Sequence, residues 1–229
     1  MGHFNWLQYW LHLETNQVSI ATAVLVTGLI VVLSAVARLS LGQGEAAIAP
    51  AGRISVKGVF EVLVEGLAGL AKTVLGKGGR IYLPVFGSIF FYILFNNLFG
   101  LLPGMAAATA NINLGLGIGI FSFLLYNFLG LRQNGLQYLA HFAGPVWWLA
   151  FLMIPIELVS HFVRPLSLAL RLSINMTGDH TILAIFTDLT KVGVPVIFYA
   201  LGTFVSLVQA FVFTLLSMIY VMMATAHDH

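Results

Sequence analysis

The chain has 229 residues, of which 59% are hydrophobic and 8% charged, and its formal net charge is +2. A typical soluble domain carries about 25% charged residues, so this composition excludes a water-soluble fold and indicates an integral membrane protein. The small net charge gives no reason to expect a nucleic-acid partner, and the lack of cysteine excludes disulfides and thiolate metal sites. We therefore expect a single membrane domain over residues 1–229.

Five apolar segments are long enough to cross a bilayer as helices. About 20 helical residues span a hydrocarbon core of about 30 Å. An N-terminal segment at 1–17 lacks the basic start of a signal peptide. The predicted crossings that follow it are 18–37, 82–102, 112–131, 147–187 and 193–226. The last two exceed the minimal length, so we expect tilt or kinks, and the first of them contains Pro155 and Pro165.

Local composition adds two details. The third crossing contains a glycine-rich run at 114–120, which allows neighbouring helices to approach closely. Asp188, Lys191 and Gly193 mark the break between the two long segments.

The basic residues predict the orientation. Six of the ten Lys and Arg residues lie between the first and second crossings, whereas residues 103–111 contain none. The positive-inside rule therefore places the 38–80 segment in the cytoplasm. The N-terminus is then outside the membrane, and five crossings place the C-terminus in the cytoplasm.

An amphipathic helix is predicted at 54–75 within this basic segment. Lys57, Glu61 and Glu65 recur every four residues against a set of apolar positions. Two interpretations remain open. The helix either lies on the membrane surface by its apolar side, or caps the bundle as a solvated helix.

A polar stripe on the 147–187 segment contains the most unusual charge. From Glu157, the polar positions His161, Arg164, Arg171 and Asn175 follow at spacings of 4, 3, 7 and 4, which is the pattern of one helical face. Arg at a bilayer centre costs about 2.5–3.5 kcal/mol and usually faces protein or water. We therefore expect this face to meet another protein surface or water. One alternative is that Glu157 and Arg164 form an internal ion pair.

Arg171 has no carboxylate three or four residues away, so we expect its counter-charge to come from elsewhere. Guanidinium does not release its proton in proteins, so Arg171 can attract a carboxylate but not relay a proton. Groups able to relay protons are Glu157 and His161 before it and Asp179 and His180 after it. Ideal geometry places Asp179 about 80° and His180 about 180° from Arg171. The alternative for His180 is a packed histidine at a helix interface.

Weaker polar positions occur in the other crossings. They are Asn96, Asn97, Asn111, Asn113, Thr203, Ser206, Gln209 and Ser217. Each one alone fits a hydrogen bond between helices. As a set, they also suit a hydrated path opposite the Arg171 helix.

Three stretches resemble subunit a of F-type ATP synthases. They are RPLSLALRLSINMTGDH at 164–180, LVQAFVFTLLSMIY at 207–220, and NNLFGLLP at 96–103 followed by NIN at 111–113. The similarity extends through the four later crossings, about 80–226. The arginine with Asn four and Met five residues later is the specific part of the signal.

The resemblance implies a proton-translocating stator beside a ring of c subunits, with the two long C-terminal helices as a hairpin that provides two offset half-channels. Arg171 matches the essential stator arginine. Glu157 and Ser160 match the cytoplasmic half-channel, and Asn175, His180 and Gln209 match the outer one. The implied partners are the c-ring, b-type peripheral stalk subunits and the remainder of the complex.

The sequence departs from the family at the outer relay. Bacterial relatives often carry Glu at the position of His180, paired with a His where this chain has Gly202. We expect the neighbouring Asp179 to supply the missing acid.

Other function classes remain as alternatives. A secondary ion transporter would also use intramembrane charges, but no internal repeat is visible, and a structural scaffold would not need Arg171. The chain has no phosphate loop or metal-ligand spacing, so we expect no cofactor, no metal and no ATP binding by the chain itself. The expected location is a bacterial inner membrane, with an organellar membrane as the alternative.

Overall fold

The structure, a computed structural model, describes residues 5–12, 14–40, 56–135, 138, 150–190 and 193–225. These residues are helical apart from short turns, and no strand occurs among them. The elements are α1 (Trp6–Leu11), α2 (Thr15–Ser40), α3 (Val56–Leu75), η2 (Gly76–Tyr82), α4 (Leu83–Gly100), η3 (Ala108–Ala110), α5 (Ile112–Asn134), α7 (Ala150–Leu189) and α8 (Val194–Thr225).

Five of the described helices are long and apolar enough to cross a membrane. These spans are Gln17–Arg38, Gly78–Gly100, Ile112–Asn134, Phe151–Leu189 and Val194–Thr225. The prediction of an all-α integral membrane protein with about five crossings is confirmed. The helix ends differ from the predicted bounds by a few residues, and residues 54–55, 147–149 and 226 lie outside the described residues.

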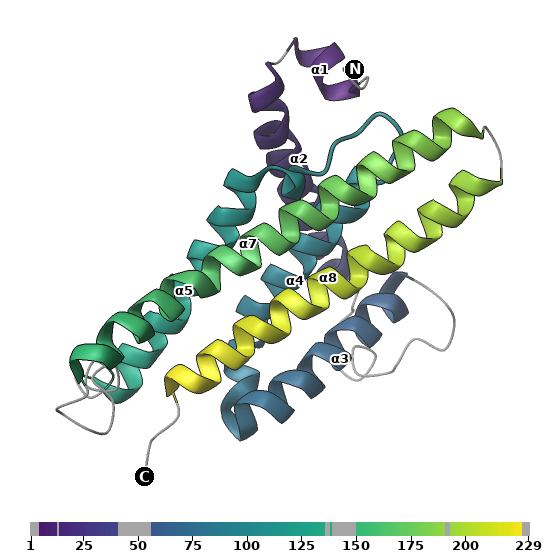
Figure 1. Ribbon diagram of the computed structural model, residues 1–229. Helices are drawn as coiled ribbons and strands as arrows, with labels where there is room; N and C mark the ends of the chain where they lie inside the picture. Colours follow the sequence, from purple (N-terminus) through teal and green to yellow (C-terminus); the bar gives the residue numbers. More distant parts are fainter. Residues whose placement is uncertain are drawn as a thin grey trace.

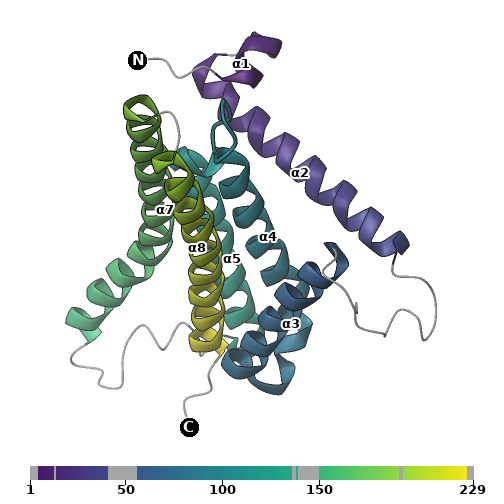
Figure 2. The same ribbon diagram turned by 90° about the vertical axis from the view of Figure 1, so that its right-hand side faces the viewer.

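Helices α7 and α8 run antiparallel and contact each other, and α4 and α5 lie next to them (Figure 1). The first part of α7 bends away from the line of its second part (Figure 2). Pro155 and Pro165 lie inside this helix, and an internal proline removes one backbone hydrogen bond and kinks a helix. The expected bend is therefore present.

Helix α5 approaches α7 through two small residues. A Cβ added at Gly115 would lie 2.6 Å from Ser173 Oγ, and one added at Gly119 would lie 2.7 Å from the carbonyl oxygen of Pro165. Any side chain at these positions would separate the two helices. The glycine-rich run therefore permits the close approach that its composition predicts.

The amphipathic helix α3 packs against α4 and α8 near the C-terminal end of the bundle (Figure 2). Leu67 and Ala71 on its inner side are buried, whereas Val59 and Val62 are exposed. Contact with the bundle fits the capping interpretation, whereas the exposed valines fit a position on the membrane surface, so both interpretations stay open.

The core lies between α4, α5, α7 and α8. Its fully buried side chains include Phe86, Ile93, Leu172, Phe213 and Met218. Helix α2 contacts the bundle near η3 but diverges from α4 toward its C-terminal end (Figure 2). The bundle is thus open beside α2.

Candidate functional site

Arg171 lies near the middle of α7, on the side that faces away from the bundle. Leu168, Leu172 and Ser173 are buried around it, while Arg171 itself is exposed. No hydrogen bond or ion pair joins its guanidinium to any other residue in the described ranges. The apolar half of α7 therefore fixes the helix against α5 and α8, and the charge points outward from this chain.

The outward face of α7 is extensive. About 17% of its most apolar stretch is buried, compared with 44% for α8. Ser160 and Asn175 are exposed on this face, and Ile174, next to Arg171, is 64% exposed. A charged residue on such a face needs another protein surface or water beside it, because lipid would not solvate it.

The polar stripe is not one uniform face. His161 is buried with 6% of its surface exposed, whereas Arg171 is exposed. At 100° per residue, His161 lies about 40° to one side of Glu157 and Arg171 about 40° to the other, a separation of about 80°. Leu168 lies on the His161 side and is also buried. The stripe was expected to meet another protein surface or water, and for His161 that protein surface is α5 of the same chain.

A hydrogen-bonded cluster surrounds His161 at the end of α7 nearer its N-terminus. We call Tyr126, Asn127, Tyr138 and His161 the histidine cluster. The Nε2 of His161 lies 2.9 Å from Asn127 Oδ1, and the Tyr138 hydroxyl donates to the same oxygen at 3.0 Å. An amide oxygen only accepts, so Nε2 donates and Nδ1 is left to accept from the Tyr126 hydroxyl at 3.4 Å.

Arg164, unlike Arg171, has partners within the chain. Its Nη2 lies 3.7 Å from Glu157 Oε1, and its Cζ lies 5.5 Å from the centre of the Tyr220 ring. The ion pair that the spacing left open is therefore present. The contrast isolates Arg171 as the cation with no such partner among the described residues of α7.

A second polar region lies on the other side of Arg171, where α7 meets α8. Asn175 Nδ2 donates to Gln209 Oε1 at 3.1 Å. The Oδ2 atom of Asp179 and the hydroxyl of Ser206 are buried and have no hydrogen-bond partner among the described residues. Buried polar groups in native proteins are normally satisfied by protein or water, so this region suits a hydrated path.

A cavity of about 500 Å³, here called the His180 cavity, follows at the far end of α7. Its lining residues are Thr177, His180, Thr181, Leu183, Ala184, Thr187 and Asp188 of α7, Tyr199 of α8, and residues 100–107 and 110 near the α4–α5 turn. Asp179 is not among them, so Asp179 and His180 point in different directions, as ideal helix geometry predicts.

Asp188 and Tyr199 were not predicted as site residues. The sequence marks Asp188 only as the end of an apolar segment, because the cavity forms from three separate parts of the chain. The one usable signal was a carboxylate two helical turns beyond His180, which ideal geometry places about 80° away.

Close contacts surround both Gly202 and Gly100. A Cβ added at Gly202 would lie 2.8 Å from Leu101 Cδ2, and one added at Gly100 would lie 2.7 Å from His180 Nε2. The turn after α4 thus occupies the space beside both residues. A side chain at position 202 has no room while Leu101 keeps this position.

Asn97 and Asn111 form hydrogen bonds within the chain. Asn97 Oδ1 accepts from the Thr109 hydroxyl at 2.6 Å. Asn111 caps α5 by accepting from the backbone N–H of Asn113 at 3.0 Å, and it donates to Ser19 of α2 at 3.3 Å. Asn113 itself is exposed. These contacts fit the structural interpretation of Asn97 and Asn111.

Comparisons with known proteins agree with these features. The family model described as "ATP synthase A chain" matches residues 18–222. The chain is 53% identical over 227 residues to an ATP synthase subunit a from Bdellovibrio bacteriovorus, with 99% of each chain covered. It is 44% identical over 206 residues to one from Solibacter usitatus, covering 90% of this chain and 85% of the relative. A subunit a 1 from Syntrophotalea carbinolica is 42% identical over 174 residues, 76% and 74% of the two chains.

Proposed function

Because this chain belongs to the ATP synthase subunit a family and is a proton-translocating stator subunit of the Fo membrane sector, we propose that Arg171 faces a carboxylate on a moving ring of c subunits. The observation that carries the proposal is the exposed guanidinium without a partner among the described residues. Family membership does not favour the alternatives of a secondary transporter or a structural scaffold.

The chemistry of this arrangement follows from one contrast. An ionised carboxylate is too costly to move through lipid, so a ring carboxylate crosses lipid only when it is neutral. Beside the positive charge of Arg171, its ionised form is favoured. The carboxylate therefore loses its proton near Arg171 and regains one before it moves back into lipid. Arg171 keeps its own proton and repels protons that would pass directly between the two sides.

The presence of two polar regions, one before and one after Arg171 along α7, is evidence for two half-channels. Glu157 precedes Arg171 by 14 residues, a rise of about 21 Å, and His180 follows it by 9 residues, a rise of about 13 Å. We assign Glu157, Ser160 and the histidine cluster to one half-channel. Asn175, Gln209, Asp179 and the His180 cavity belong to the other. Asp188 provides a negative charge at the wall of that cavity, which attracts protons.

The charge distribution supports an orientation for these half-channels. Arg38, Lys72, Arg80 and Arg132 all lie near the ends of α2, α3, η2 and α5, on the side opposite α1 (Figure 2). The positive-inside rule places this side in the cytoplasm. The His180 cavity is then the outer entrance, and each proton crossing about 100 mV contributes about 2.3 kcal/mol to ring rotation. The preferred location is a bacterial inner membrane.

Replacing Arg171 with Ala tests the central role. We expect Arg171→Ala to abolish proton-driven ATP synthesis in membrane vesicles while the detached head still hydrolyses ATP. Ile174→Ala is the matched control, because it removes an exposed side chain from the same face of the same helix. Coupled synthesis by the Arg171 variant at the rate of the control would contradict the proposal. Cross-links between position 171 and a c subunit would support the assigned partner.

The outer relay has a separate test. If Asp179 and His180 serve successive steps of one pathway, the double change Asp179→Asn, His180→Ala slows proton translocation more than either single change. The measurement is ATP-driven acidification of inverted vesicles. Wild-type rates in the double variant would remove both residues from the pathway, whereas Arg171→Ala would still distinguish the stator role.

A further inference from the structure

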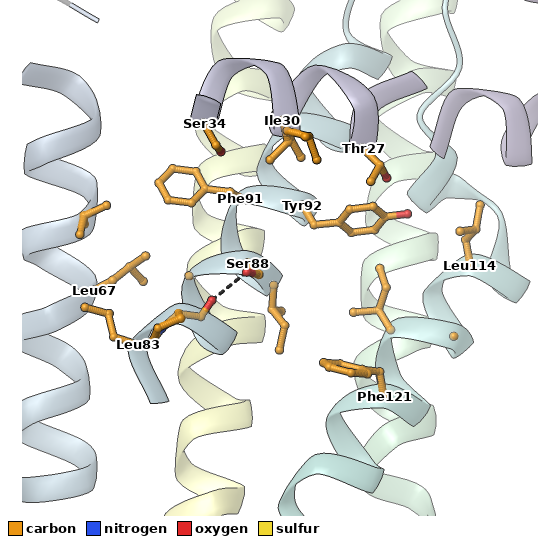
Figure 3. Close-up of a pocket in the computed structure, with 17 residues that line it drawn as sticks. Thr27, Ile30, Ser34, Leu67, Leu83, Ser88, Phe91, Tyr92, Leu114 and Phe121 are labelled. Atoms are coloured by element: carbon orange, nitrogen blue, oxygen red, sulfur yellow. Dashed lines mark hydrogen bonds between the residues drawn. The ribbon is translucent and has the colours of Figure 1, made fainter. Parts of the chain in front are cut away.

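A second cavity, of about 750 Å³, lies between α2, α3, α4 and α5 (Figure 3). No residue of α7 or α8 lines it, so it is separate from the residues assigned to the proton path. Figure 3 shows the rings of Phe91 and Tyr92 beside the part of α2 that carries Thr27, Ile30 and Ser34. We call this space the α2 cavity.

The chemistry of the α2 cavity matches an alkyl chain. Most of its lining is aliphatic or aromatic, and the residues are Thr27, Ile30, Val31, Ser34, Val64, Leu67, Leu83, Pro84, Gly87, Ser88, Ile89, Phe91, Tyr92, Leu114, Gly117, Ile118 and Phe121. Two of its hydroxyls are already used, since Thr27 donates to the Ala23 carbonyl and Ser88 to the Pro84 carbonyl, both at 2.7 Å. A polar ligand would find few free hydrogen-bond partners here, whereas a hydrocarbon chain needs no hydrogen bonds.

Two glycines give the cavity part of its depth. A Cβ added at Gly87 or Gly117 would meet no other atom within 4 Å. The glycines on the other side of α5 behave differently, because a Cβ at Gly115 or Gly119 would collide with α7. The open space at Gly87 and Gly117 is therefore specific to the side that faces α2.

The length of the cavity matches one leaflet of a bilayer. On α4 its lining runs from Leu83 to Tyr92, ten residues whose nine steps rise about 13 Å. Half of a hydrocarbon core of about 30 Å is about 15 Å. One acyl chain of a phospholipid in the adjacent leaflet therefore has the right extent.

Positive charge lies at one end of this space. Arg38 follows Ser34 by four residues and so continues the same face of α2, and Arg80 precedes Leu83 by three residues at the start of α4. Both arginines are exposed. Glu65 of α3 projects from another side of its helix, about 160° from Leu67 by ideal geometry. Two arginines therefore continue the helix ends that line the cavity.

We propose that the α2 cavity binds an acyl chain of an anionic phospholipid, with the lipid phosphate beside Arg38 and Arg80. Apolar lining, leaflet-sized length and the two arginines that continue the lining helices all favour this occupant. The lipid fills the space where α2 diverges from α4 (Figure 2) and thereby links α2 to the rest of the bundle.

The test uses the purified ATP synthase complex that contains this chain, held in lipid nanodiscs. The probe is a phosphatidylglycerol with a photoreactive diazirine near the end of one acyl chain, and the comparison is a phosphatidylcholine with the same chains. After illumination, peptide mapping locates the labels. We expect phosphatidylglycerol to label α4 and α5 peptides of the cavity at least fivefold more than phosphatidylcholine. About fivefold corresponds to about 1 kcal/mol per basic residue near an anionic lipid surface.

Variants separate the cavity from general lipid contact. Gly87→Leu and Gly117→Leu fill the open space, so labelling of the cavity peptides should fall at least fivefold. Gly69→Leu is the control, because Gly69 also has open space around it but does not line the cavity. Arg38→Gln and Arg80→Gln should each reduce the preference for phosphatidylglycerol without reducing total labelling to the same degree.

Three results would overturn the proposal. The first is equal labelling by the two headgroups in the unmodified complex. The second is labelling that is unchanged when the cavity is filled. The third is a cross-link from Ser34→Cys to a helix of another subunit, which would give the cavity a protein occupant. If the filled variants fail to assemble, the headgroup preference and the label positions in the unmodified complex still test whether the cavity binds an anionic phospholipid.

Discussion

Substituting Gly119 with Ala gives a sharp test of how this chain positions its essential arginine. Gly119 of α5 faces the backbone of α7 at Pro165, six residues before Arg171. The added Cβ would lie 2.7 Å from the Pro165 carbonyl oxygen, whereas ordinary contact begins at 3.4 Å. The two helices must therefore separate by about 0.7 Å (3.4 − 2.7), because a backbone oxygen cannot rotate away as a side chain can.

The expected effect follows from that displacement. Overpacking a tight contact costs about 1–3 kcal/mol, which a large bundle can tolerate. Misplacement of a functional group by about 1 Å can lower a rate about 100-fold, so we expect Gly119→Ala to slow proton pumping at least tenfold while the complex still assembles. Gly117→Ala is the matched control, because it adds the same methyl group to the same helix where nothing lies within 4 Å.

The assay is ATP-driven quenching of a pH-sensitive dye in inverted vesicles, with the amount of assembled complex measured by immunoblot. ATP hydrolysis by the head provides an internal reference for each preparation. Wild-type pumping by Gly119→Ala would refute the link between the α5–α7 contact and the placement of Arg171. Equal impairment of the Gly119 and Gly117 variants would refute it as well, since the two differ only in the space around the methyl group.

Two further predictions use the same assay. If the hydrogen bond between Asn175 and Gln209 holds α7 against α8, Asn175→Leu and Gln209→Leu should each slow pumping severalfold. The double variant should be no slower than the worse single variant, because the effects of removing two partners of one interaction are not additive. Additive losses would contradict this role of the hydrogen bond. His161→Phe keeps the ring shape but removes the hydrogen bond to Asn127, so pumping should fall severalfold with assembly unchanged, and an unaffected rate would exclude the histidine cluster from proton transfer.

The crossings were predictable from sequence because predominantly apolar runs of this length are typical of membrane-spanning helices. The exposure of Arg171 was also predictable, since its neighbours in sequence offer no carboxylate. The division of the polar stripe needed a finer measure than shared periodicity: His161 and Arg171 lie about 80° apart on an ideal helix, enough to bury one and expose the other.

The remaining features depend on tertiary contacts. The His180 cavity combines the turn after α4 with the ends of α7 and α8, and nothing local in the sequence brings these parts together. The hydrogen bond from Thr109 to Asn97 and the capping role of Asn111 likewise depend on how the turn folds. Sequence indicated polar residues near a path, but it did not separate those that hold the turn in place from those that face open space.

The contact between Leu101 and Gly202 restricts the order in which this protein can change during evolution. A histidine at position 202, which the family resemblance leads us to expect there, would collide with the Leu101 side chain unless that leucine became smaller or moved. Gly202→His alone should therefore be harmful, whereas Leu101→Ala followed by Gly202→His should be tolerated. Because the obstacle is the end of a side chain and not backbone, the cost of Gly202→His depends on how far Leu101 can turn aside.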